Sequence, residues 1–117
     1  MELGSRRRSQ PAPPGVVWRS LADPHDPAAR PWLDLTEDEI EPQILESREP
    51  ELIVWSSLWP ERPDDRVRFD IEPDRGGGSM LRWTVTSAAP VSEPARLHVC
   101  YRMNVLINAS LRYSYGQ

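Results

Sequence analysis

Nucleophilic chemistry would need a serine or cysteine close to a histidine, and this sequence offers few such pairs. His25 and His98 are its two histidines, and Ser56 and Ser57 interrupt an apolar stretch. Neither histidine stands at a spacing from these serines that matches a nucleophile elbow or a Ser-His-Asp triad. The sequence therefore predicts a hydrogen-bonded core hydroxyl in this stretch, and we assign no catalytic residue.

Acid–base and metal chemistry have only weak candidates. Glu46, His98 and Tyr101 could exchange protons with a substrate, but the sequence leaves open which face of its element each one occupies. The loop 23–26 combines two aspartates with a histidine, yet prolines flank it and no residues that could orient metal ligands stand nearby. We therefore expect a solvated loop there, with no metal and no cofactor.

Seven residues are candidates for a ligand pocket because of where they fall in the periodic pattern. Five are large apolar residues on the apolar period of a predicted strand or helix, and two are asparagines four residues apart at the edge of a helical stripe. They are Trp55, Phe69, Trp83, Met103, Ile107, Asn104 and Asn108. The same patterns are typical of core packing and of local hydrogen bonds, so both interpretations stay open.

The first third of the chain predicts one strand, one short helix and then a stretch with little regular structure. Residues 1–10 are either a flexible basic arm or an edge strand, with the strand favoured. A helix is expected at 14–22, where proline occupies the first turn. The following stretch allows at most one helical turn, anchored by Trp32 and Leu33. The capping-box sequence at 36–39 is expected to be an acidic surface segment.

The rest of the chain predicts strands and one long helix. Residues 43–48 form a weak strand candidate, and three stronger strands follow at 52–59, 66–72 and 81–86. Their short connections make an antiparallel meander, with a hairpin at the glycine run 76–78.

The closing helix begins after Ser92, which suits the N-cap position, and runs to about Tyr113. Its apolar stripe consists of Val99, Cys100, Met103, Leu106, Ile107 and Leu111. Arg102 and Arg112 fall outside this stripe, so we expect both to face water.

Composition limits the class of protein. The chain has 117 residues, a length that fits one domain over 1–117. Its net charge of −4 argues against a nucleic-acid partner. Cys100 is the only cysteine, so an intramolecular disulfide is excluded. No apolar run has the length of a membrane span and no signal-peptide pattern opens the chain, so we expect a cytoplasmic protein without a membrane span.

Four stretches of sequence resemble the SRPBCC or START-like superfamily. They are PGVVW with LADP at 14–24, PELIVWSS at 50–57, GGGSMLRW at 76–83 and YRMNVLIN at 101–108. The superfamily includes polyketide cyclase-like, lipid-transfer-like and chaperone-activator-like members. The resemblance implies an α+β helix-grip fold, in which a curved antiparallel sheet wraps around a long C-terminal helix, here with a shortened sheet.

The resemblance also implies a function class without implying one catalytic mechanism. We expect a small apolar or amphipathic ligand in a pocket between helix and sheet. Two alternatives stay open. One is a cyclase-like or dehydratase-like enzyme, and the other is a protein-interaction module that uses an exposed sheet edge, with a homodimer as one form.

Overall fold

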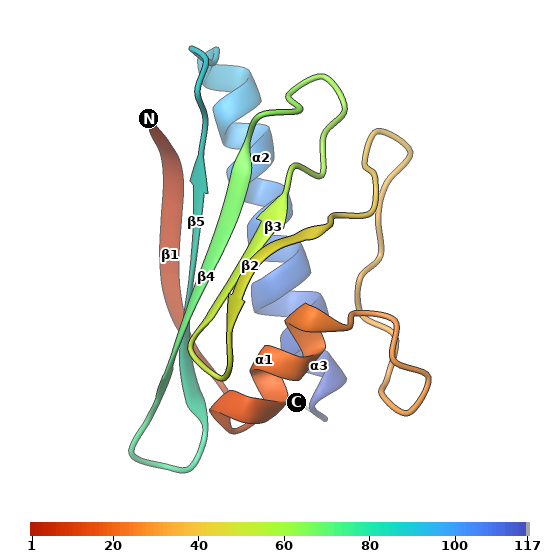
Figure 1. Cartoon of the computed structure of the whole chain (residues 1–117), viewed down its shortest axis with the longest axis vertical. Coiled ribbons are helices and arrows are strands. Elements are labelled where there is room, and N and C mark those ends of the chain that lie inside the picture. Colours follow the sequence, from red (N-terminus) through yellow and green to blue (C-terminus); the bar gives the residue numbers. More distant parts are fainter. Residues whose placement is uncertain (117) are drawn as a thin grey trace.

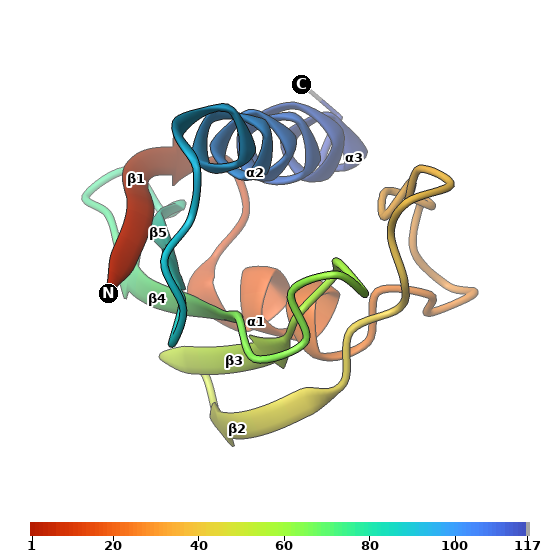
Figure 2. The ribbon, with the colours of Figure 1, turned by 90° about the horizontal axis from the view of Figure 1, so that it is seen from above.

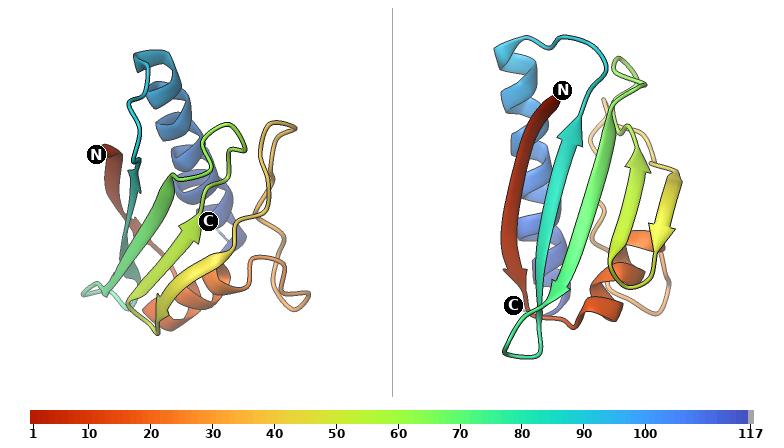
Figure 3. Two further views of the ribbon diagram at one scale, coloured as in Figure 1. Left: turned by 45° about the horizontal axis from the view of Figure 1, so that its top comes forward. Right: turned by 60° about the vertical axis from the view of Figure 1, so that its left-hand side comes forward.

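Strands β4 (Arg66–Pro73) and β5 (Ser79–Thr86) form the centre of the sheet because their buried apolar residues alternate with more exposed ones. In the computed structural model, which describes residues 1–116, three more strands extend the sheet: β1 (Glu2–Gln10), β3 (Leu52–Ser56) and β2 (Ile44–Arg48). All pairings are antiparallel, in the order β1-β5-β4-β3-β2 (Figure 3, right). The predicted meander is confirmed, and the N-terminal segment is an edge strand.

Two helical segments cover the concave face of this sheet (Figure 2). Helix α1 (Pro14–Ala22) is the shorter one. The long helix begins as α2 (Glu93–Val105), continues through a π-helical turn (Leu106–Leu111) and ends as α3 (Arg112–Ser114). Ser92 is the N-cap, because its side-chain oxygen accepts from the Ala95 amide at 3.3 Å. Among residues 1–116, no helix combines the length and the apolar character that a membrane crossing requires.

The core lies between the sheet and the long helix. The residues that the helix buries there include Val99, Met103, Ile107 and Leu111. Gly4 of β1 comes so close to α2 that a Cβ atom at this position would stand 2.3 Å from Cys100 Sγ. The edge strand can therefore approach the helix this closely only because glycine has no side chain.

Residues 23–43, which we call the strap, connect α1 to β2 without regular secondary structure. The strap runs along the open side of the molecule, between the long helix and the β2 edge of the sheet (Figures 1 and 2). Trp32 and Leu33 are buried, so they anchor this segment as predicted. Connections of this length without secondary structure are uncommon in small domains and often serve a function.

The structure corrects three expectations about charged residues. Glu39, expected at the surface, is 7% exposed, and Arg102, expected to face water, is 8% exposed. Arg102 donates to both Glu39 carboxylate oxygens, at 2.8 and 2.7 Å, and to the Asp34 carbonyl at 3.0 Å. Arg112 is half-buried and donates to the Ser9 carbonyl. Helical periodicity uses only the polarity of each residue. It therefore cannot predict an ion-pair or hydrogen-bond partner that lies far away in the sequence.

The charge on Glu39 is stabilised by its partners. Burial disfavours ionisation of this carboxyl, but hydrogen bonds from Arg102 and from the Thr36 amide, together with the charge of Arg102, outweigh that cost. The pKa of Glu39 therefore lies below its usual value, and the strap is tied to α2 by a buried ion pair.

Candidate ligand-binding site

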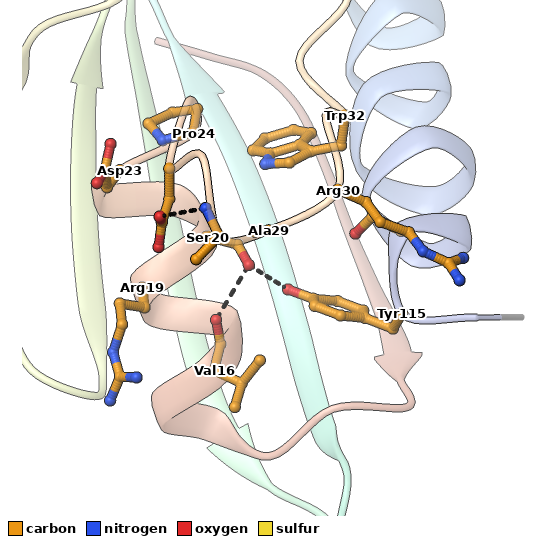
Figure 4. Close-up of a pocket in the computed structure, with 12 residues that line it drawn as sticks. Val16, Arg19, Ser20, Asp23, Pro24, Ala29, Arg30, Trp32 and Tyr115 are labelled. Atoms are coloured by element: carbon orange, nitrogen blue, oxygen red, sulfur yellow. Dashed lines mark hydrogen bonds between the residues drawn. The ribbon is translucent and has the colours of Figure 1, made fainter.

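A hollow of about 370 Å³ opens between α1, the first part of the strap and the end of the long helix (Figure 4). We call it the α1 hollow. Its apolar lining comes from Val16, Pro24, Ala28, Ala29 and Trp32. The volume falls within the range of small-molecule pockets, which are mostly apolar with a few placed polar groups.

The polar lining of the α1 hollow includes a chain of two hydroxyl groups. The Tyr115 hydroxyl donates to Ser20 Oγ at 2.9 Å, and Ser20 Oγ donates to the Val16 carbonyl at 3.1 Å (Figure 4). Burial raises the pKa of Tyr115 to about 12, and the hydrogen bond to Ser20 opposes this shift only in part. The phenol is therefore neutral at physiological pH, and its oxygen retains lone pairs that can accept from a ligand.

Charged side chains lie at the margin of the hollow. Arg19 and Arg30 are exposed and form no ion pair with another residue in the range 1–116. Figure 4 shows both guanidinium groups pointing away from the centre. Asp26 is engaged locally, since its carboxylate accepts from the Ala28 amide at 2.9 Å. Asp23 also lines the hollow and forms no ion pair within residues 1–116, so the margin offers one carboxylate and two guanidinium groups that can pair with an acidic group.

Trp32 closes the inner end of the α1 hollow. Its side chain comes from the strap and stacks on Trp55 of β3, with ring centroids 6.1 Å apart and an interplanar angle of 19°. The residue is 5% exposed, and its indole nitrogen is shielded from solvent with no described acceptor within hydrogen-bond distance. A buried donor without a partner costs about 1–3 kcal/mol.

The seven residues predicted from sequence lie deeper than this hollow or away from it. The five apolar ones, Trp55, Phe69, Trp83, Met103 and Ile107, are all buried in the core. Trp55 and Phe69 meet edge to face at 4.7 Å, and Phe69 pairs with Trp83 across β4 and β5. The two asparagines are half-buried, and Asn108 Nδ2 donates to Asn104 Oδ1 at 2.9 Å. Trp32 joins the α1 hollow to this group through its contact with Trp55.

A second hollow, of about 270 Å³, lies beside α2. His98 lines it and stands 3.4 Å from the Asp38 carboxylate, with both side chains largely exposed. Glu46 and Tyr101, the other acid–base candidates, are exposed and line neither hollow. Within residues 1–116, no group of three His, Cys, Asp or Glu side chains is arranged to hold a metal ion.

Comparison with known proteins rests on structure. No family model matches the sequence, and no curated protein is similar to it in sequence. The solved structures that share its architecture include those of three proteins. CalU16 from Micromonospora echinospora has a TM-score of 0.65 at 21% identity, over 89% of this chain and 70% of that one. The Aha1 dimer from Colwellia psychrerythraea has a TM-score of 0.69 at 14% identity, over 94% of this chain and 92% of that one. PFC0360w, an HSP90 activator from Plasmodium falciparum, has a TM-score of 0.63 at 16% identity, over 94% of this chain and 91% of that one.

The chain has the helix-grip fold. This confirms the α+β architecture implied by the sequence resemblance, with a five-stranded sheet and a long C-terminal helix. In this helix-grip chain the α1 hollow is built from α1, the strap and the end of the long helix, which are far apart in sequence. Periodicity could not bring these segments together. The only sequence feature that pointed to this hollow was Trp32, which was expected to anchor the segment after α1.

Proposed function

We propose that this helix-grip chain binds a small amphipathic molecule in the α1 hollow. The observation that carries the proposal is the hollow itself: about 370 Å³ with apolar walls, and with a hydroxyl pair on one side. Pockets of this size and composition are the usual sites of small ligands. The similarity to other helix-grip proteins supports a ligand-binding fold.

The lining suggests how such a molecule would be oriented. Val16 of α1 and Ala29 of the strap offer apolar contacts, while the Tyr115 oxygen can accept one hydrogen bond. Arg19 and Arg30 can turn toward a bound anion, because neither is held by an ion pair in the described chain. We therefore infer an apolar body that carries one acidic group.

Titration calorimetry with 2-naphthoate tests this function, since the probe combines a flat apolar body with one carboxylate. We expect binding to the wild type and its loss in Ala29→Trp, where the new side chain fills the hollow. Ala88→Trp is the matched control, because Ala88 is exposed and lines none of the hollows described above. Equal effects of the two substitutions, or no binding to the wild type, would contradict the proposal.

A second candidate function is self-association through β2, favoured by the state of this edge strand. Every residue of β2 is exposed, and three large apolar side chains at this edge, Ile44, Leu45 and Ile40 of the strap, are each at least 40% exposed. Antiparallel pairing of two copies about Ser47 would place Glu46 opposite Arg48, so the charges would complement each other. One of the similar structures is a dimer.

Light scattering after size-exclusion chromatography tests the homodimer. We expect the dimer fraction to grow with concentration in the wild type and to disappear in Leu45→Lys, because a charge at an edge strand opposes pairing. Leu97→Lys is the control, since Leu97 is an exposed leucine on α2. A wild type that stays monomeric across the micromolar range would exclude the β2 dimer.

A further inference from the structure

Trp32 lines two hollows. It closes the inner end of the α1 hollow, and it also lines an outer hollow of about 430 Å³ together with Pro31, Leu33, Asp34 and Ser110. No other residue is shared between the linings of these two hollows. Trp32 therefore borders both hollows, and removal of its indole would open space over the face of Trp55, on which it stacks.

The segment that carries Trp32 is weakly tied to the rest of the chain. Within the described range 1–116, the backbone groups of residues 30–33 make no hydrogen bond. The nearest ties are the bond from the Ala29 amide to the Asp26 carbonyl, at 3.1 Å, and the bond from Arg102 to the Asp34 carbonyl. Segments held by few hydrogen bonds open at low free-energy cost. Side-chain burial and stacking are thus what hold Trp32 in place.

The unpaired indole nitrogen of Trp32 favours movement of the ring toward water. It is shielded even from the α1 hollow, so a ligand in that hollow cannot accept from it unless the ring moves. Outward movement would return this N–H to water and remove the penalty of an unpaired buried donor. Trp55, in contrast, is fixed beneath it, because its own indole nitrogen donates to the Leu21 carbonyl at 3.0 Å.

We propose that the Trp32 indole occupies a binding slot on the face of Trp55, and that a flat aromatic ligand of about two fused rings displaces it. The inference rests on the proposed function and names the ligand class and the deeper part of its site. The slot has the shape of an indole and a fixed aromatic floor, and stacked aromatic pairs are stabilised beyond their buried area. Trp55 is then the first of the sequence-predicted pocket residues that the ligand contacts, with Phe69 directly behind it.

Chemical complementation tests the slot. Added indole should stabilise Trp32→Ala, with a rise in Tm of about 5 °C at tenfold excess over its Kd. The wild type is the control, since its own Trp32 indole occupies the slot. An equal rise in the wild type, or none in Trp32→Ala, would overturn the slot.

Displacement is tested on the wild type, so the result does not depend on whether the alanine variant folds. The indole N–H signals in ¹H–¹⁵N spectra can be assigned with Trp32→Phe, Trp55→Phe and Trp59→Phe. On addition of 2-naphthoate, we expect faster water exchange of the Trp32 N–H, a shifted Trp55 signal and an unchanged Trp59 signal. Calorimetric binding with unchanged or slower Trp32 exchange would overturn displacement and leave the proposed function standing. Absence of binding would overturn both.

Discussion

Removing one partner of the Glu39–Arg102 ion pair tests how the strap is held against α2. Arg102→Met keeps most of the apolar stem but removes the guanidinium group. The Glu39 carboxylate then stays buried with the Thr36 amide, at 3.0 Å, as its remaining donor. Breaking a buried pair in this way costs about 3–5 kcal/mol, because the remaining charge is uncompensated. For a domain of this length, the corresponding fall in Tm is about 10–25 °C.

Urea denaturation followed by circular dichroism measures the loss without adding salt. Arg68→Met is the control, since Arg68 pairs with Asp70 at 3.1 Å on an exposed face, where such pairs contribute at most about 1 kcal/mol. The double variant Glu39→Leu with Arg102→Met replaces the pair by apolar side chains and should recover most of the loss. The reasoning is refuted if Arg102→Met costs no more than Arg68→Met, or if the double variant loses the sum of the single losses.

The same pair sets a pH dependence whose sign follows from the pKa of Glu39. Because this pKa is lowered in the folded protein, the contribution to stability is complete above the pKa of the unfolded chain, about 4.3, and is lost as the pH falls through the folded value. The Tm difference between wild type and Glu39→Gln should therefore shrink from pH 6 to pH 3. Asp38 and Glu93, whose pKa values are also lowered, remain in both proteins and cancel in the difference.

Three further substitutions have expected outcomes. Met103→Ala should lower the free energy of unfolding in urea by about 2–4 kcal/mol, because the fully buried side chain leaves a cavity; a loss below about 1 kcal/mol would contradict this packing. Gly4→Ala should cost about 1–3 kcal/mol through overlap with Cys100 Sγ, and the loss should largely vanish in a Cys100→Ala background. Tyr115 has its pKa raised to about 12, so its contribution to stability is complete below about pH 10 and is lost as the pH rises through 12. Tm measured from pH 9 to 11 should fall less in Tyr115→Phe than in the wild type, and parallel curves would contradict the assignment.

The strands were predictable because their signal is local. Val67, Phe69 and Ile71 alternate with exposed or half-buried residues along β4, and burial follows that alternation. The expected core hydroxyl is also present, since buried Ser57 exchanges hydrogen bonds with the backbone of Trp59. These features depend on near neighbours in the chain, so a periodic pattern is enough to find them.

The candidate site was not predictable in the same way. Tyr115 and Ser20 meet across 95 positions, and Arg102 finds Glu39 across 63. Such contacts depend on the path of the strap, which has no periodicity of its own. Helical periodicity assumes that a charged residue faces water. Arg102 is instead buried because Glu39 neutralises its charge, so the prediction placed Arg102 on the wrong face of the helix.

The π-helical turn sets the direction of the last part of the chain. Val99, Met103, Ile107, Leu111 and Tyr115 follow one another at intervals of four residues. In a regular α-helix each such step advances about 40° beyond a full turn, so the fifth member would point about 160° away from the first. The π-helical turn at Leu106–Leu111 rotates less per residue than an α-helix, so it reduces this angle. Tyr115 therefore still packs against the core. A regular α-helical course over the same residues would rotate the phenol away from Ser20 and remove one wall of the α1 hollow.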